Sequence, residues 1–236
     1  VGGPDAEYYN YRRAPSKAPF YELEDVTKDL TYALEDQTRH GQKMPLIVLM
    51  DNGSTEEDVP AMRQAQVYGM DMLVVDHHHP HKIVDQFLIA HVNPAHQGGD
   101  FGLTTGMLAT EIARMIYPAV EEKIRHFPAV SAVGDRSEAA EAALYINLVE
   151  DRYGREDLKK IALALDYEAF WLRFNEGRGL INDILCLGRL DRHRRIVDLL
   201  CEQANAAIDE QLRASMGNVK STKLPNGIIM NVLDVE

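Results

Sequence analysis

The chain has 236 residues, of which 45% are hydrophobic, enough to bury one large domain or one domain and a half. Asp and Glu outnumber Lys and Arg by 37 to 25, and the net charge of −12 argues against a general polyanion-binding surface but allows a local one. No stretch is long enough to span a membrane and no signal peptide is recognisable, so we expect a cytoplasmic protein without a membrane partner.

The N-terminal part is expected to hold an irregular segment and one helix. Residues 1–22 contain three prolines and no clear period, which is typical of a loop or an ordered extension. Apolar residues then recur near helical spacing over 23–40. Asp25 or Thr27 is suited to cap this helix.

The following segment has the pattern of a βαβ unit. Residues 46–50 and 70–75 are apolar runs that each end in a carboxylate, as in buried parallel strands that deliver their last side chain to the edge of a sheet. The helix between them is expected to begin either with Ser54 or Thr55 as its cap or nearer Asp58, which would place Pro60 in its first turn. It is expected to end at Gly69. Such a unit is parallel and right-handed.

Beyond the histidines that follow the second strand, the pattern is less regular. A third strand is expected at 87–90, and an Asn-Pro pair then forces a turn. A glycine-rich loop precedes a helix over 103–116, for which Thr104 or Thr105 is the expected cap.

The rest of the chain is mainly helical. From 138 to 216 nearly every segment is helix-like, and the last helix, 192–216, is long. A polar linker at 220–223 leads to a terminal strand at 227–233 that has no following partner. We therefore predict an α/β fold, with a parallel sheet and flanking helices, followed by a mostly helical half and a long connector helix.

Side chains that bind metals follow two of the predicted strands. Asp51 follows the first strand, and Asp76, His77, His78 and His79 follow the second. Neutral imidazole is the commonest transition-metal ligand and carboxylates suit Mn²⁺ and Mg²⁺, so the pattern predicts a divalent metal site. Asp76 is either a ligand or the partner that orients a histidine. The alternative is plain turn chemistry for Asp51 and a solvated loop for the histidines.

Asp135 is a third candidate, in the sequence Gly134-Asp135-Arg136. It is either an ordinary surface ion pair, with Arg136 or another base, or a metal ligand brought in from a distant segment. Spacing in the sequence does not decide between these two roles.

Three further groups give weaker signals. His91 and His96 flank the Asn-Pro turn; they either lie near the site or, as we expect, are loop histidines that are satisfied by other contacts. Gly98 and Gly99 precede a helix and resemble a backbone-donor cradle for a phosphate, although glycine pairs are common in plain loops. Several arginines of the helical half either contact phosphates or are simply solvated: Arg173, Arg178, Arg189, Arg192, Arg194 and Arg195.

Three short motifs of one enzyme family occur here in the same order and with similar spacing: Asp51-Asn52-Gly53, Asp76-His77-His78 and Gly134-Asp135. The chain thereby resembles the DHH phosphoesterase superfamily over roughly residues 42–140, and the three segments look like its second, third and fourth motifs. The residues around the motifs are most similar to the archaeal RecJ-like exonucleases.

This resemblance implies a phosphodiester hydrolase with two divalent metal ions, usually Mn²⁺ and otherwise Mg²⁺. By motif, Asp51 would bridge the two ions, and His77 and Asp135 would complete one site with a ligand from the first motif. His78 would face the phosphate, and Asp76 would support the histidines.

One departure from the family pattern is clear. The first motif, an Asp-rich turn, is not found upstream of Asp51 and is expected to precede residue 1. The DHH domain is therefore predicted over 1–216, with 217–236 as a linker and the first strand of a DHH-associated domain. We expect a fragment in which one or more metal ligands are missing and which has little activity by itself.

Three functions are compatible with these features. The leading one is an exonuclease on single-stranded DNA or RNA, with replication or repair proteins as partners. The second is a small-substrate phosphoesterase of the same superfamily, acting on short oligonucleotides or cyclic dinucleotides. The third is a catalytically silent domain that binds nucleic acid or scaffolds replication proteins. The four residues Asp51, His77, His78 and Asp135 argue against the third, since a silent domain need not keep metal ligands.

Overall fold

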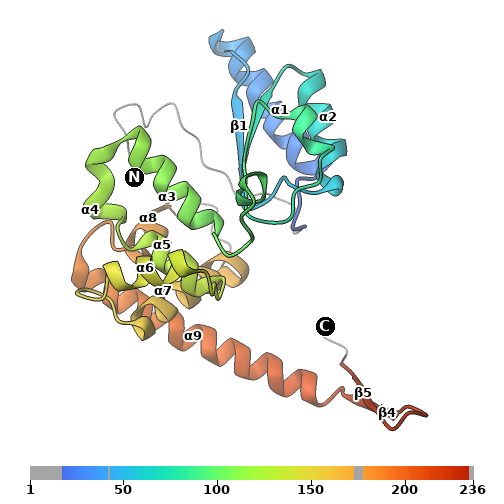
Figure 1. The fold of residues 1–236 in the computed structure, drawn as a ribbon, viewed down its shortest axis with the longest axis vertical. Helices are drawn as coiled ribbons and strands as arrows, with labels where there is room; N and C mark the ends of the chain where they lie inside the picture. Colours follow the sequence, from blue (N-terminus) through green and yellow to red (C-terminus); the bar gives the residue numbers. More distant parts are fainter. Residues whose placement is uncertain (1–17, 42, 173–177, 234–236) are drawn as a thin grey trace. The chain divides into compact units, whose positions relative to one another are not determined.

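The computed structural model describes residues 18–41, 43–172 and 178–233 (Figure 1). Most of the predicted N-terminal extension lies outside these residues. Within them, no helix is long and apolar enough to cross a membrane. The chain divides into two compact units, Val1–Leu158 and Lys159–Glu236. The predicted domain limits, 1–216 and 217–236, stay a prediction, because compactness alone does not define the limits of a family domain.

The first unit contains a three-stranded parallel sheet, which confirms the predicted α/β class. The strands are ordered β1 (Leu46–Met50), β2 (Asp71–Val75) and β3 (Ala90–Val92). β1 and β2 confirm the predicted βαβ unit. The third strand begins at Ala90 instead of spanning 87–90, because Val84–Phe87 forms the 3₁₀ helix η3.

Two helices pack against this sheet and against each other, α1 (Leu23–His40) and α2 (Val59–Val67). Figure 1 shows both beside β1. Their apolar sides share one core with the strands, in which Met62, Met72 and Val74 are fully buried. This core fixes the position and direction of β1 and β2. It therefore also positions the residues that follow these strands, Asp51 and Asp76.

β1 differs from the predicted strand in its burial. Leu46, Val48 and Met50 are 50%, 48% and 49% exposed, whereas Leu49 is buried. The prediction of a strand buried on both faces is therefore wrong for β1. This strand lies at an edge of the sheet, and among the described residues the helical core covers the face that carries Ile47 and Leu49.

The N-termini of α1 and α2 are capped in different ways. α2 begins where Pro60 predicts, with Asp58 as its N-cap and the short 3₁₀ helix η2 (Glu56–Asp58) before it. The predicted caps of α1 are wrong, because Glu22 is the N-cap. Asp25 acts from the third helical position, where its carboxylate accepts a hydrogen bond from the Glu22 N–H at 2.9 Å.

The remainder of the first unit is helical. Its elements after β3 are η4 (Pro94–Gln97), α3 (Thr105–Ile116), η5 (Pro118–Val120), α4 (Glu121–Ile124), α5 (Phe127–Gly134) and α6 (Ala140–Leu148). Thr104 is the N-cap of α3, as one of the two predictions has it. α3 packs on α5, and α5 packs on α6. The Thr104 hydroxyl lies 2.6 Å from that of Ser131, so the start of α3 is tied to α5.

The second unit combines helices with a hairpin. Its elements are the C-terminal part of α7 (Arg155–Tyr167), the π-helical η6 (Glu168–Leu172), α8 (Arg178–Ile184), α9 (Leu190–Met216), β4 (Lys220–Lys223) and β5 (Ile229–Val232). α9 confirms the long last helix.

The predicted linker at 220–223 is wrong, since these residues form β4 and pair antiparallel with β5. The terminal strand therefore has a preceding partner. A tight turn joins the two strands: the Gly227 N–H donates to the Leu224 carbonyl at 2.9 Å, and Gly227 has a φ of 85°. The Pro-Asn-Gly sequence at this turn is typical of hairpins, although the residues before it are predicted as a linker.

Candidate metal centre

The backbone places two acidic residues side by side at the carboxyl edge of the sheet. Asp51 directly follows β1, and Asp76 directly follows β2. The Asp51 N–H donates to the Val75 carbonyl at 3.0 Å, and the Asp76 N–H donates to the Val92 carbonyl at 3.0 Å. The parallel ladder thus continues one residue past each strand, and both carboxylates are carried on ordered backbone.

The turn after β1 has an unusual backbone. Asp51 has a φ of 64°, in the left-handed region that Asp tolerates better than most residues. Gly53 has a φ of 93°, and a Cβ on it would lie 2.8 Å from Val74 Cγ2 and 3.0 Å from Leu49 Cδ1. Only glycine fits this close approach to the core. The Asp-Asn-Gly sequence therefore forms the turn after β1, as the alternative prediction for Asp51 has it. The same turn directs the Asp51 side chain toward His77.

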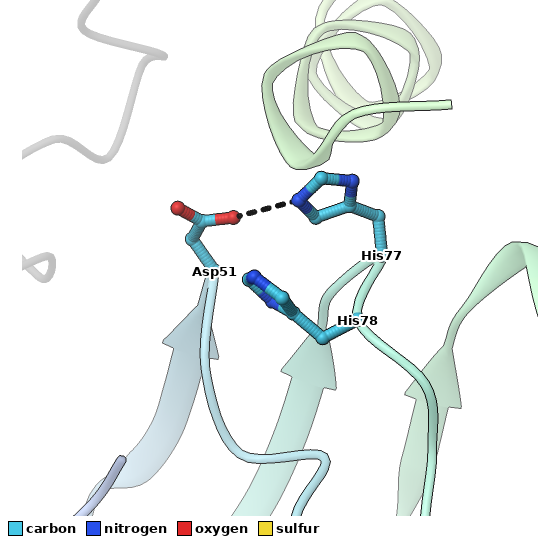
Figure 2. Close-up of side chains that lie close together, drawn as sticks. All are labelled: Asp51, His77 and His78. Atoms are coloured by element: carbon cyan, nitrogen blue, oxygen red, sulfur yellow. Dashed lines mark ion pairs between the residues drawn. The ribbon is translucent and has the colours of Figure 1, made fainter. Parts of the chain in front are cut away.

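Asp51, His77 and His78 form one group of metal-binding atoms. Each offers one ligand atom, and these atoms all lie within 4.8 Å of one another. His77 Nε2 lies 3.6 Å from Asp51 Oδ1, and both side chains point into the same space above the strand ends (Figure 2). The predicted metal cluster is therefore assembled in part by the fold.

The proton on His77 is located by its second contact. His77 Nδ1 lies 2.7 Å from the backbone oxygen of Phe101, in the loop before α3. A carbonyl oxygen only accepts, so Nδ1 carries the proton and, in the neutral ring, Nε2 directs its lone pair toward Asp51. A backbone acceptor behind the ring is the usual arrangement for a histidine that binds a metal. His77 Nε2 and Asp51 Oδ1 are then two acceptors that face each other, and a cation fits between them.

Asp76 supports both histidines from below. Its carboxylate is 1% exposed, and Oδ1 accepts hydrogen bonds from the His77 N–H at 2.8 Å and from His78 Nδ1 at 2.7 Å. Oδ2 is buried and, among the described residues, has no partner in full hydrogen-bond geometry, although the Ser54 hydroxyl approaches the group. Asp76 thus has the supporting position that the resemblance implies.

The Asp76–His78 pair shifts both protonation equilibria. Burial alone would raise the pKa of Asp76, but hydrogen bonds from Ser54 and His78 hold it below its ordinary value. Burial alone would lower the pKa of His78, but Asp76 and the nearby charges of Asp51 and Asp135 hold it above its ordinary value. Because Nδ1 is bound to Asp76, Nε2 is the atom of His78 left to meet a ligand.

Asp135 lies at the C-terminal end of α5 and is exposed. It is not a member of the 4.8 Å group, but its charge reaches His78. The fold thus brings this distant residue toward the centre, and its role as a ligand stays a prediction.

The two predicted phosphate-binding glycines already use their backbone donors. The Gly98 N–H donates to the Ala95 carbonyl at 3.2 Å, and the Gly99 N–H donates to the Pro94 carbonyl at 3.0 Å. A phosphate would have to displace these bonds, so the cradle stays a prediction.

Two of the predicted arginines of the helical half form ion pairs. Arg189 pairs with Asp191 at 2.8 Å, and Arg192 pairs with Asp183 at 2.7 Å. Arg173 lies outside the described residues. A surface pocket at the start of α9 nevertheless collects three guanidinium groups, one carboxylate and two aliphatic side chains: Arg189, Arg192, Arg195, Asp191, Ile196 and Leu199.

A second group of metal-binding side chains lies nearby in the sequence and is not predicted as a metal site. Asp85, His91 and His96 also offer ligand atoms within 4.8 Å of one another. The histidines are visible in the sequence on either side of the Asn-Pro turn. Their acidic partner on η3 is not, because no residue pattern indicates that a 3₁₀ turn brings Asp85 back beside β3.

Comparison with known proteins gives two strong matches and no matching family model. The chain is 48% identical, over 253 aligned residues, to an uncharacterized protein of Methanocaldococcus jannaschii, covering 98% of this chain and 33% of that protein. A solved structure described as the DHH domain of a member of a family of ribosomal proteins superposes with a TM-score of 0.88 at 44% identity. The likeness supports the DHH superfamily.

The match to the DHH domain covers the whole of this chain and 56% of the solved one. The chain thus spans a third to somewhat over half of the length of the relatives it matches. The parallel sheet with flanking helices fits a DHH fold, and the group of Asp51, His77 and His78 is consistent with a metal site of that fold. Neither relative's description names an exonuclease activity or a metal.

Proposed function

We propose that this chain forms the metal-binding core of a DHH-family phosphoesterase that hydrolyses phosphodiester bonds. The observation that carries the proposal is the His77 ring, held by the Phe101 carbonyl so that Nε2 faces Asp51 at 3.6 Å. A carboxylate and an imidazole aimed at one point on a rigid sheet edge suit a divalent cation. The likeness to a DHH domain supports phosphoester chemistry at that edge.

In this proposal Asp51 and His77 hold a Mn²⁺ or Mg²⁺ ion, and Asp135 completes the set from the end of α5. When bound, the ion would neutralise phosphate charge and lower the pKa of a bound water. His78 Nε2–H donates a hydrogen bond to a phosphate oxygen, because Asp76 orients the ring through Nδ1 and keeps it protonated to a higher pH. Asp76 itself is too deeply buried to touch the substrate.

The proposed substrate is single-stranded DNA or RNA, cleaved as in the RecJ-like exonucleases, with replication or repair proteins as partners. The resemblance of residues around the motifs supports this choice. The pocket on α9 supports it as well, since its three guanidinium groups outnumber its one carboxylate, Asp191, and guanidinium groups bind backbone phosphates. Such a local basic surface is what an acidic chain with a net charge of −12 needs to bind a polyanion.

Two readouts test the proposal in wild type, Asp51→Asn and His77→Ala, with His79→Ala as the matched control. His79 belongs to the same histidine run but is exposed and outside the ligand group. The first and deciding readout is Mn²⁺ binding by calorimetry. The second is the residual Mn²⁺-dependent hydrolysis of labelled single-stranded DNA, single-stranded RNA and dinucleotides, which is expected to be low for this chain by itself. We expect both site variants to lose binding and hydrolysis, and the control to keep them. Unchanged Mn²⁺ binding in both site variants would refute the centre, and a preference for dinucleotides would refute the strand substrate.

A further inference from the structure

Three elements of the first unit bring two imidazoles and one carboxylate together outside the candidate centre. Asp85 belongs to η3, His91 to β3 and His96 to η4. His91 Nδ1 lies 2.8 Å from Asp85 Oδ1, and His96 Nε2 lies 3.8 Å from the same oxygen. The two rings meet edge to face, with centroids 4.6 Å apart.

His91 is held in place from behind. Its side chain is 5% exposed, and its backbone is paired with Val74 in the sheet. Nε2 lies 3.1 Å from the hydroxyl of Ser54, which is itself fully buried. Ser54 therefore fixes the plane of the ring, and Nδ1 is left facing Asp85. A metal-binding histidine has this arrangement, with one nitrogen toward the ion and the other on a fixed partner.

His96 is carried on a turn that is also fixed. Asn93 caps η4 by accepting from the Ala95 N–H at 3.0 Å, and its amide donates to the His78 carbonyl at 2.8 Å. Pro94 lies at the start of the turn. The side chains of Asp85 and His96 are 45% and 34% exposed, so one side of the group is open to solvent.

A simple hydrogen bond explains only part of this geometry. It accounts for the 2.8 Å contact between Asp85 and His91, but His96 Nε2 lies 3.8 Å from the same oxygen, beyond hydrogen-bond distance. The ligand atoms of a tetrahedral zinc ion lie about 3.4 Å apart, for ion–ligand distances of about 2.0–2.2 Å. The two separations from Asp85 Oδ1 bracket that value, and all three ligand atoms lie within 4.8 Å of one another, so modest side-chain movements suffice.

We propose that Asp85, His91 and His96 form a second metal site, which takes a divalent transition ion of the zinc class. Two imidazoles and one carboxylate are a ligand set for zinc with a fourth position open to water or a ligand. The ion would fasten η3 and η4 to β3, beneath the loop that carries Ser54. This site shares no ligand with Asp51, His77 and His78, and the proposal does not depend on phosphoesterase activity.

The test uses Co²⁺, a spectroscopic substitute for zinc, in the Asp51→Asn/His77→Ala background, where the first group is disabled. The chelator-treated protein is titrated with Co²⁺ and followed by visible absorption and calorimetry. Asp85→Asn and His96→Ala are added singly to this background, with His40→Ala as the control. His40 is an exposed histidine in the last turn of α1. Circular dichroism checks that each variant is folded. Asp85 and His96 are substituted because their side chains are partly exposed, whereas His91 is buried and is left unchanged.

We expect the background protein and the His40→Ala control to bind one equivalent of Co²⁺ with the intense visible bands of a four-coordinate ion. Asp85→Asn and His96→Ala should each weaken this binding by more than about tenfold. The proposal is overturned if the folded background protein binds no Co²⁺, or if both variants bind it as tightly as the control. A wild type without nuclease activity would not affect either outcome, so this test is separate from that of the proposed function.

Discussion

His77 Nε2 faces Asp51 Oδ1 across 3.6 Å, while Nδ1 of the same ring donates to the Phe101 carbonyl. The contact joins three parts of the chain: the end of β1, the end of β2 and the loop before α3. The two side chains are thus oriented before any ion binds, which reduces the cost of assembling a metal site.

Asp51→Asn and His77→Ala should each weaken Mn²⁺ binding by more than about tenfold, because each removes one ligand atom of the group. Asp71→Asn is the matched control, since Asp71 is an exposed aspartate at the opposite end of β2. Electron paramagnetic resonance of free Mn²⁺ measures the affinity. Equal affinity for Asp71→Asn and the two site variants would mean that the ion is held elsewhere.

Gly53→Ala should destabilise the protein by about 3 kcal/mol or more, from left-handed strain plus a clash with the core. Gly41→Ala separates the two causes: Gly41 has a φ of 63°, but a Cβ there would meet nothing within 4 Å. We expect about 1–2 kcal/mol for this control, from strain alone. Urea unfolding gives both free energies. If the two variants lose the same stability, the close approach to Val74 has no energetic weight.

Much of the sheet and the core of the site could be predicted from local sequence. Apolar runs that end in Asp51 and Asp76 specify two parallel strands, and parallel strands bring their carboxyl ends to one edge. Pro60 places the start of α2 for a local steric reason. These features depend on a few adjacent residues, so the sequence alone is sufficient to reveal them.

The features that could not be predicted depend on distant neighbours. The exposure of Leu46 and Val48 depends on what covers β1, and alternation is not visible in a run that is apolar throughout. The partnership of Asp85 with His91 and His96 depends on how η3 and η4 fold back, and short 3₁₀ turns have no strong residue pattern. The hairpin of β4 and β5 is not predicted despite its Pro-Asn-Gly turn, because both strands are exposed and β4 is polar.

Tyr145→Phe should lower the free energy of unfolding by about 1–2 kcal/mol, because it removes a hydrogen bond to a charged acceptor. The Tyr145 hydroxyl donates to Glu111 Oε1 at 2.6 Å and links α6 to α3. Burial, together with this contact, raises the pKa of Tyr145 to about 12. Glu111 keeps Arg114 as a partner, so the variant leaves no isolated charge. Tyr68→Phe, at an exposed tyrosine, is the control in the same denaturation experiment.

Asp76→Asn should lower the pKa of His78 in the metal-free protein. In the wild type Asp76 accepts from His78 Nδ1 at 2.7 Å and holds the pKa of that ring above its ordinary value. An amide of the same shape keeps the packing but removes the negative charge that favours the protonated ring. The His78 resonances, followed by NMR from acid to mildly alkaline pH in the presence of a chelator, report the change, and exposed His40 is the internal control.

The Asp76–His78 pair also predicts how the free energy of unfolding changes with pH. The lowered pKa of Asp76 means that its contribution is complete above its unfolded pKa and is lost as the pH falls through the folded value. The raised pKa of His78 means that its contribution is complete below its unfolded pKa and is lost as the pH rises through the folded value. The cost of Asp76→Asn, measured by urea unfolding of the metal-free protein, should therefore be largest between the two folded pKa values. It should shrink as the pH rises past that of His78. A cost that does not change across that range would show that Asp76 stabilises the loop through its backbone contact to His77 and not through the charge on His78.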